Sequence, residues 1–147
     1  MNILPCKFMS ADGWGKTSDA IQCMDWCLEQ KAEIISASWS CGELSNPPLE
    51  EAVARTKQAG ALLVIAAGNQ GADMRKTPYY PQSYARQYDN VLVVGASDEY
   101  DEHAFFSNHD PDTVHLSAPG HWIYSTTVGG GYNFSSGTSI AAPYVSG

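Results

Sequence analysis

Near its middle, the chain of 147 residues carries the segment Ala61-Leu62-Leu63-Val64-Ile65-Ala66-Ala67-Gly68-Asn69. Every residue before Gly68 in this segment is apolar. A strand with one face in solvent alternates apolar and polar side chains, whereas a strand of a parallel sheet with both faces covered does not. The run therefore predicts a strand buried on both sides. Residues 91–96, which read VLVVGA, predict a second strand of the same kind.

The pattern around these two strands alternates between strand and helix. We expect a strand over Asn2–Phe8 that Pro5 confines to an edge or a bulge, a helix capped by Thr17 or Ser18 and running to about Lys31, a strand over Ile34–Ser38, and a helix from Asn46-Pro47 to a stop at Gly60. With right-handed crossovers, this order predicts an α/β fold: a doubly wound, mostly parallel sheet with helices on both faces.

After Pro119 the pattern changes. Two runs, 122–128 and 132–135, flank Gly129-Gly130-Gly131 and predict a β-hairpin. A helix that begins near Thr138 has only about two turns before Gly147, which is short for a stable helix.

Composition excludes some classes of function. Hydrophobic residues make up 44% and charged residues 16% of the chain, which is a globular composition. Lys and Arg number 8 against 16 Asp and Glu, giving a net charge of −8. This acidic balance argues against a nucleic-acid partner. The longest apolar run, 61–67, is far shorter than the about 20 residues of a membrane span.

The cysteines and histidines offer no metal-site spacing. Cys6, Cys23, Cys27 and Cys41 form no CxxC motif, although Cys23 and Cys27 would share one helical face. We expect small buried thiols, with a disulfide or a metal site as the alternatives. The four histidines at 103, 109, 115 and 121 are evenly spaced by six, which we interpret as coincidence.

Two polar residues stand where a site is expected. Asn69 follows a strand at its carboxyl end, where ligands bind in open α/β sheets. Ser139 opens the last predicted helix, so its backbone N–H is among the unpaired donors that stabilise an anion. One segment thus offers a nucleophile and half of an oxyanion hole. The alternatives are a turn residue at Asn69 and a helix cap at Thr138 or Ser139.

At these residues the sequence resembles the subtilisin-like serine proteases (subtilases). Residues 137–147, GTSIAAPYVSG, match the motif around the family's nucleophilic serine, and residues 66–71, AAGNQG, match the motif of its oxyanion asparagine. Softer matches at 12–15, 80–81 with 91–96, and 106–108 with 117–120 agree in order and spacing. The likeness extends over essentially the whole chain.

The resemblance implies a serine endopeptidase that cuts peptide bonds through an acyl-enzyme. Ser139 would be the nucleophile, and Asn69 would donate to the oxyanion beside the Ser139 N–H. An extended polypeptide would lie between two edge segments and reach into one pocket. The implied substrate-binding residues are Gly13, Trp14 and Gly15 on one edge, Ser38, Trp39 and Ser40 on the other, and Ala66, Ala67 and Gly68 in the pocket.

Three positions depart from the family pattern. Ser40 stands where glycine is frequent, which alters the fit of substrate along that edge. Tyr79 replaces a small residue of the pocket floor and makes the pocket shallower. Ile140 replaces a frequent methionine and removes an oxidisable thioether. The family often binds calcium, but no calcium ligands are assignable in this sequence, and no other cofactor is indicated.

The family's catalytic order is Asp, then His, then Ser. Its Asp and His motifs belong upstream of the segment equivalent to Asn2–Phe8, and its nucleophile helix continues past Gly147. We therefore expect residues 1–147 to be part of a catalytic domain, truncated at both ends. The chain alone should be inactive and poorly soluble.

Two other classes of function compete with this reading. One is a non-catalytic pseudoprotease or peptide-binding fragment that lacks the catalytic Asp and His. The other is an α/β-hydrolase, which would need Gly instead of Ala141 and an Asp and a His after Ser139. The resemblance weakly favours a secreted or endomembrane location. The glycosylation pattern Asn133-Phe134-Ser135 is common by chance.

Overall fold

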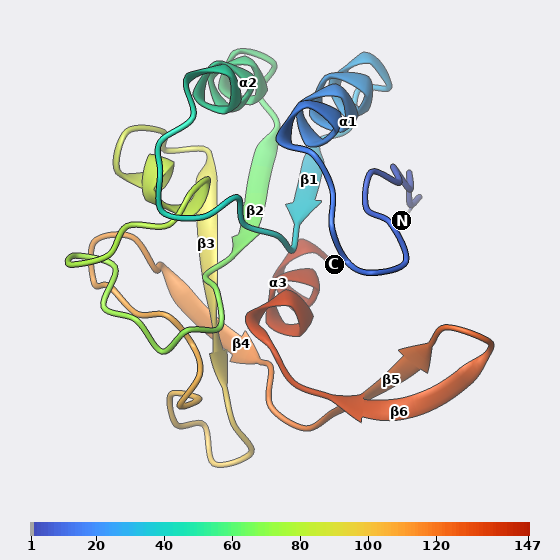
Figure 1. The fold of residues 1–147 in the computed structure, drawn as a ribbon, viewed down its shortest axis with the longest axis vertical. Coiled ribbons are helices and arrows are strands. Elements are labelled where there is room, and N and C mark those ends of the chain that lie inside the picture. The colour runs from blue at the N-terminus through green and yellow to red at the C-terminus, as the bar shows by residue number, and fades with distance from the viewer. Residues whose placement is uncertain (1) are drawn as a thin grey trace.

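The computed structural model of the chain describes residues 2–147 and contains a parallel sheet with helices packed on both of its faces (Figure 1). The sheet has the order β1-β2-β3-β4, and every neighbouring pair is parallel. The predicted fold class is therefore confirmed. In chain order the elements are α1 (Thr17–Glu29), β1 (Ile34–Ala37), α2 (Pro47–Gln58), β2 (Leu62–Ala66), the 3-10 helix η1 (Gln82–Arg86), β3 (Val91–Ser97), β4 (Leu116–Pro119), β5 (Ile123–Thr127), β6 (Gly131–Ser135) and α3 (Thr138–Ser146).

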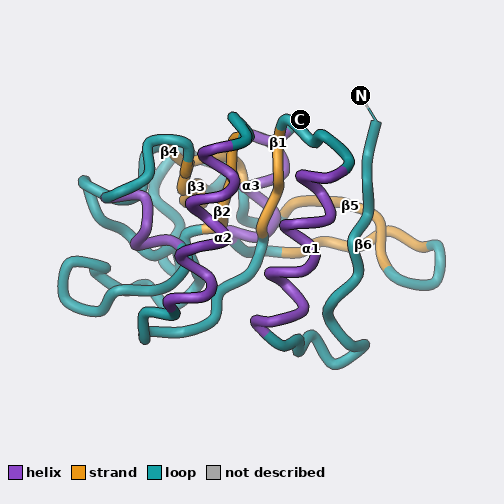
Figure 2. The backbone as a smooth tube through the Cα atoms, turned by 90° about the horizontal axis from the view of Figure 1, so that it is seen from above, coloured by secondary structure: helices purple, strands orange, loops and turns teal. Residues whose placement is uncertain are grey.

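The two central strands are buried, as their apolar runs predict. The last four residues of β2 and all but two residues of β3 are buried. One hydrophobic cluster joins their side chains to α1 and α2, and a second cluster joins the opposite face to α3. Figure 2 shows α1 and α2 lying side by side. Burying each large apolar side chain contributes about 1.5–3 kcal/mol, so β2 and β3 give the site a rigid base.

A side-chain cap marks the start of α2 but not that of α1. The side chain of Asn46 accepts a hydrogen bond from the N–H of Leu49 at 3.1 Å, and Pro47 begins α2, as predicted. The cap predicted for α1 is wrong. Lys16 occupies the capping position without a side-chain bond, because Thr17 already lies in the first turn and Ser18 donates to Asp19. This helix ends at Glu29, two residues earlier than expected.

The first predicted strand is absent. Residues 2–8 form no strand in the structure, since no neighbouring strand supplies a ladder and Pro5 has no N–H to donate. A disulfide between Cys6 and Cys23 ties this segment to α1. The sheet is instead completed by β4, which the sequence pattern missed because it has only four residues and exposes three of them.

The disulfide corrects the expectation of buried thiols for two of the four cysteines. Cys27 and Cys41 are free and half-buried, and burial raises the pKa of both thiols. Among residues 2–147, no group of three His, Cys, Asp or Glu side chains is placed to hold a metal ion. The described residues therefore supply no such side-chain cluster for calcium.

The C-terminal elements lie as predicted. Strands β5 and β6 pair antiparallel from Ile123↔Ser135 to Thr127↔Gly131, and this hairpin projects from the sheet in both views (Figures 1 and 2). Gly137 precedes α3 without a side-chain cap, so neither Thr138 nor Ser139 caps this helix. In the part of the chain that the structure describes, no helix combines the length and the apolar character that crossing a membrane requires.

Candidate active site

The end of β2 and the start of α3 meet at Thr138. Its hydroxyl accepts a hydrogen bond from the N–H of Gly68 at 3.0 Å and donates to Asn69 Oδ1 at 2.9 Å. The Thr138 N–H donates to the same Oδ1 at 2.8 Å. Thr138 is buried, at 1% exposure, and so holds the exposed Asn69 in place. Because Oδ1 is engaged by Thr138, the Nδ2 group of Asn69 is the donor that remains.

Three groups surround the point where a side chain on Gly137 would begin. A Cβ built on Gly137 would lie 3.0 Å from Ser139 Oγ, 3.3 Å from Asn69 Nδ2 and 3.7 Å from the Ser139 backbone N. A hydroxyl nucleophile and two N–H donors therefore converge on one small space. An oxyanion needs donors at about 2.7–3.1 Å from its oxygen, and glycine leaves room for it.

The nucleophile candidate has a defined position but no base within the described residues. Ser139 is half-buried in the first turn of α3, and its carbonyl accepts a hydrogen bond from Ser38 Oγ at 3.0 Å. Among residues 2–147, no side chain hydrogen-bonds the Ser139 hydroxyl. The N–H groups of the first helical turn also favour negative charge at this end of the helix.

The four histidines have other neighbours. His103 Nε2 lies 3.0 Å from the carbonyl of Ser107, and the ring of His109 packs against His103. His115 Nδ1 accepts from the Val93 N–H at 3.0 Å. His121 lies among aromatic rings, including that of Phe106. The even spacing of six therefore marks no common site in the structure.

The second predicted substrate edge, residues 38–40, is held beside the nucleophile. In addition to the bond from Ser38, the Trp39 carbonyl accepts from Gln82 Nε2 at 3.3 Å, and Ser40 Oγ donates to the carbonyl of Tyr80 at 3.0 Å. The hydroxyl of Ser40, at a position where glycine is frequent in the resembling family, thus anchors this edge to the segment that contains Tyr79 and Tyr80.

The first predicted edge, Gly13-Trp14-Gly15, forms an exposed turn. Ser10 N–H donates to the Trp14 carbonyl at 2.8 Å, and Trp14 is 81% exposed. None of these residues hydrogen-bonds α3. The link between the edges is Phe8, whose ring meets Trp39 edge-on at 5.6 Å and lies so close to Gly15 that a Cβ there would come within 2.7 Å of it.

Of the residues predicted to line the pocket, Ala66 and Ala67 are buried and only Gly68 is partly exposed. A side chain that the sequence analysis missed joins this end of β2 to the edge. Gln82 is fully buried, and its Nε2 donates to the Ala66 carbonyl at 2.7 Å as well as to Trp39. Tyr79 lies half-buried with its hydroxyl 3.5 Å from Glu43 Oε1. Burial raises the pKa of the Tyr79 phenol, and the negative charge of Glu43 raises it further.

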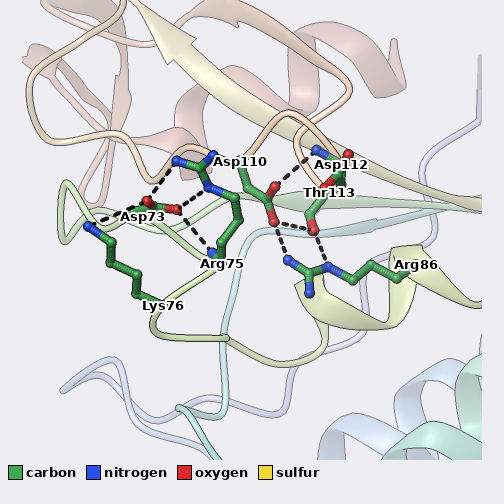
Figure 3. A network of polar contacts seen from close by, with 7 residues as sticks. All are labelled: Asp73, Arg75, Lys76, Arg86, Asp110, Asp112 and Thr113. Atoms are coloured by element: carbon green, nitrogen blue, oxygen red, sulfur yellow. Dashed lines mark hydrogen bonds and ion pairs between the residues drawn. The ribbon is translucent and has the colours of Figure 1, made fainter.

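Polar contacts support the loop after Asn69 and the turn beside it, and Figure 3 draws those of Asp110 and Asp73. Asn108 Oδ1 accepts from the N–H groups of Gln70 and Ala72, at 3.1 and 3.0 Å. Asp110 is 3% exposed and accepts from Thr113, from the Asp112 N–H and from Arg86. Burial alone would raise the pKa of Asp110, but these hydrogen bonds and the Arg86 charge lower it overall.

Within the loop itself, two basic side chains face the carboxylate of Asp73. Arg75 donates two hydrogen bonds to the carboxylate of Asp73, and Lys76 lies 3.9 Å away. The hydrogen bond from Arg75 holds the pKa of Asp73 well below its ordinary range. The sequence indicated Thr138 only as a possible helix cap and as part of a motif. No pattern indicated that Thr138 holds Asn69, or the contacts of Gln82 and Asp110, because each acts through a partner that is distant along the chain.

Comparison with known proteins finds one family along the whole chain. The model of the subtilase family, Peptidase_S8, matches residues 1–147. The chain is 34% identical over 151 residues to subtilisin-like protease 2 of Plasmodium falciparum (isolate 3D7), covering 100% of this chain and 11% of that protein. It is 38% identical over 145 residues to the thermophilic serine proteinase of Bacillus sp. (strain AK1), covering 99% of this chain and 34% of that protein.

A solved structure agrees with the sequence comparison. The crystal structure of a cold adapted subtilisin-like serine proteinase superimposes with a TM-score of 0.84 at 32% identity, over 96% of this chain and 49% of that chain. The chain therefore spans less than half the length of each of these relatives.

Proposed function

The chain belongs to the subtilase family, and on that premise we propose that it forms the nucleophile-bearing part of a serine endopeptidase. The convergence of Ser139 Oγ, Asn69 Nδ2 and the Ser139 N–H on the space beside Gly137 carries this proposal. Membership supports serine protease chemistry at the level of the family. The geometry of the site supports the roles proposed for Ser139 and Asn69.

In the proposed reaction, Ser139 Oγ attacks the carbonyl carbon of the scissile peptide bond. The carbonyl oxygen becomes an oxyanion and accepts hydrogen bonds from Asn69 Nδ2 and the Ser139 N–H. The hydroxyl proton must pass to a base and then to the leaving amine, after which water hydrolyses the acyl-enzyme. Thr138 is a positioning residue, since it fixes Asn69 without touching the substrate.

We place the base and the carboxylate that orients it outside residues 1–147. Among the described residues no side chain hydrogen-bonds the Ser139 hydroxyl, and a serine without a base is a weak nucleophile. The relatives are longer than this chain, which leaves room for both groups in the polypeptide that contains it. Residues 1–147 would then be one part of a catalytic domain.

The proposed substrate is a polypeptide in an extended conformation. Residues 38–40 offer it an edge adjacent to Ser139, and Gly13-Trp14-Gly15 offers the opposite edge. Substrates of many sequences can form backbone hydrogen bonds with these edges. Selectivity for substrate side chains therefore has to come from the pocket beside Ala66, Ala67 and Gly68.

The unpartnered Ser139 hydroxyl also favours a second candidate, a non-catalytic subtilase that binds peptide. One experiment separates the two. The native polypeptide that contains residues 1–147 is treated with a fluorophosphonate probe, which labels only activated serines, and its hydrolysis of an unstructured protein substrate is measured. We expect labelling and hydrolysis, both abolished by Ser139→Ala. Peptide binding without labelling would contradict the endopeptidase and support the second candidate.

A further inference from the structure

We propose that Glu43 makes the site select substrates with a basic side chain, Lys or Arg, directly before the scissile bond. This inference deepens the proposed endopeptidase function and rests on it. It follows from where Glu43 lies relative to Ser139, from its uncompensated charge and from the ring beside it.

The segment from Ser38 to Glu43 connects the nucleophile to the far side of the pocket. At its start, Ser38 Oγ donates to the Ser139 carbonyl at 3.0 Å. Farther along, Gly42 and Tyr80 form an antiparallel bridge in which the Tyr80 N–H donates to the Gly42 carbonyl at 2.9 Å. At its end, the Glu43 carboxylate reaches the Tyr79 hydroxyl at 3.5 Å. The exposed Glu43 carboxylate therefore lies at the other end of this segment from Ser139, where a substrate side chain that follows the segment would meet it.

The charge of Glu43 is not compensated. The five ion pairs among residues 2–147 involve Asp25, Asp89, Asp73 and Asp110, and none involves Glu43. Its partner Tyr79 is a neutral donor, and the raised pKa of the phenol keeps it neutral. A negative charge at the end of a pocket attracts a cation, and more strongly once bound substrate displaces water.

A lysine or arginine side chain matches the whole pocket. Its aliphatic stem would lie along the backbone of residues 38–42, because the side chains of Ala66 and Ala67 are themselves buried, and its charged end would meet the exposed Glu43 carboxylate. The Tyr79 ring beside this path adds a cation–π contact. A long apolar side chain would instead remove water from Glu43 without replacing its hydrogen bonds, which costs free energy. The net charge of −8 also attracts basic peptides.

Three peptides that differ only in the residue before the scissile bond test the inference. Lysine, norleucine and alanine share the backbone, and norleucine has nearly the length of lysine without its charge. With the native polypeptide that contains residues 1–147, we expect kcat/KM for lysine to exceed that for norleucine about tenfold, a modest value for one charged contact. The preference should shrink in 1 M salt, where the Debye length falls to about 3 Å.

Two variants test whether Glu43 causes the preference for lysine over norleucine. Glu43→Gln removes the charge and keeps the shape, and should bring the lysine-to-norleucine ratio close to one. Glu29→Gln makes the same change of net charge at the exposed end of α1, and should leave the ratio as it is. An unchanged ratio in Glu43→Gln overturns the inference, and so does a preference for alanine, which would mean that Tyr79 closes the pocket.

Measurements of peptide binding distinguish a failure of this inference from a failure of the proposed endopeptidase function. The same peptides are titrated against the Ser139→Ala variant and followed by tryptophan fluorescence. If no peptide is hydrolysed by the native polypeptide but lysine binds more tightly than norleucine in a Glu43-dependent way, the endopeptidase proposal fails and the pocket assignment stands. If Ser139-dependent hydrolysis occurs with equal rates for lysine and norleucine, or if the lysine peptide neither binds nor is cut, the assignment is overturned.

Discussion

At the scale of single residues, the missing side chain of Gly137 is as important as the side chains around it. The space that it leaves is bounded by Ser139 Oγ and Asn69 Nδ2, at 3.0 and 3.3 Å from where a Cβ would stand. We predict that Gly137→Ala places a methyl group where the oxyanion forms. The expected result is a loss of kcat of at least about tenfold, because one displaced oxyanion donor costs about 10²–10³.

That reference magnitude was measured on the oxyanion asparagine of a subtilisin, a member of this same family, and is carried over here. The readout is single-turnover hydrolysis by the native polypeptide, with the thermal unfolding midpoint as a control for folding. A Gly137→Ala variant that folds and retains full kcat would show that no oxyanion occupies this space.

Thr138 gives a prediction that separates positioning from direct contact. Thr138→Val keeps the volume but removes the hydroxyl that Asn69 and the Gly68 N–H share. We expect kcat to fall about 10- to 100-fold with little change in KM, since the oxyanion donor is loosened and not removed. Thr138→Ser restores the hydroxyl and should recover most of the rate. A loss that serine does not rescue would indicate a packing role alone.

At the scale of elements, the Asp110 network ties the turn at residues 110–113 to Arg86 of η1, next to Asn108 and His109, which hydrogen-bond the loop after Asn69. Asp110→Asn keeps the size of a buried side chain but removes the charge that Arg86 and Thr113 face. We predict a loss of about 1–3 kcal/mol in the free energy of unfolding, at the low end for a buried pair because Arg86 is partly exposed. Urea denaturation measures it, with Asp112→Asn as the control, since Asp112 contributes only its backbone N–H.

The lowered pKa of the Asp110 carboxyl predicts that the stability of the folded chain depends on pH. The pKa of Asp110 is lower in the folded chain than its usual value of about 3.9, so the folded state binds this proton less readily. Its contribution to stability is therefore present above about pH 4 and is lost as the pH falls through the lowered pKa. Asp110→Asn should flatten the decline of stability below pH 4. An equally steep decline in the variant would assign it to other carboxylates, Asp73 first.

The elements that could be predicted from the sequence are those whose signal is local. The apolar run of β2 and the cap at Asn46 each report burial or hydrogen bonding within a few residues, and both are confirmed. The strand expected at residues 2–8 had a suitable composition but lacks a partner in the structure. At the site, motif resemblance indicated Ser139 and Asn69. The orientation of Asn69 depends on Thr138, which lies 69 residues away along the chain, so no local pattern contains it.

The hairpin β5–β6 combines a predictable shape with an exposed aromatic face. Tyr124 and Phe134 are cross-strand partners, and Trp122 and Tyr132 extend the same face, with exposed fractions from 53% to 64%. Residues 113–147 contain no Asp, Glu, Lys or Arg that would oppose association. We predict that Tyr124→Thr with Phe134→Thr reduces the aggregation and dye binding of residues 1–147 without changing the circular dichroism. Asn133→Thr, on the opposite face, is the control and should change neither.

At the scale of the whole molecule, the residues of the candidate site come from the segments after β1 and β2 and from the start of α3, and no side chain among residues 2–147 hydrogen-bonds the Ser139 hydroxyl. Serine, histidine and aspartate of a catalytic triad act as a unit, so the loss of one partner removes nearly all of their joint effect. The oxyanion donors that remain would leave only weak catalysis over water. On the proposed function, residues 1–147 would therefore hold a binding surface and a nucleophile whose rate depends on groups supplied from outside this range.

This dependence gives the last prediction. Purified residues 1–147, made soluble by the paired Tyr124→Thr and Phe134→Thr changes if those behave as expected, should show no hydrolysis that Ser139→Ala abolishes. The native polypeptide that contains them should show it. The assay follows a fluorogenic peptide with lysine before the scissile bond, and circular dichroism establishes that the short chain is folded. Ser139-dependent hydrolysis by the short chain would mean that a base lies within residues 1–147, and His121, at the start of the hairpin that leads into α3, would be the first residue to replace.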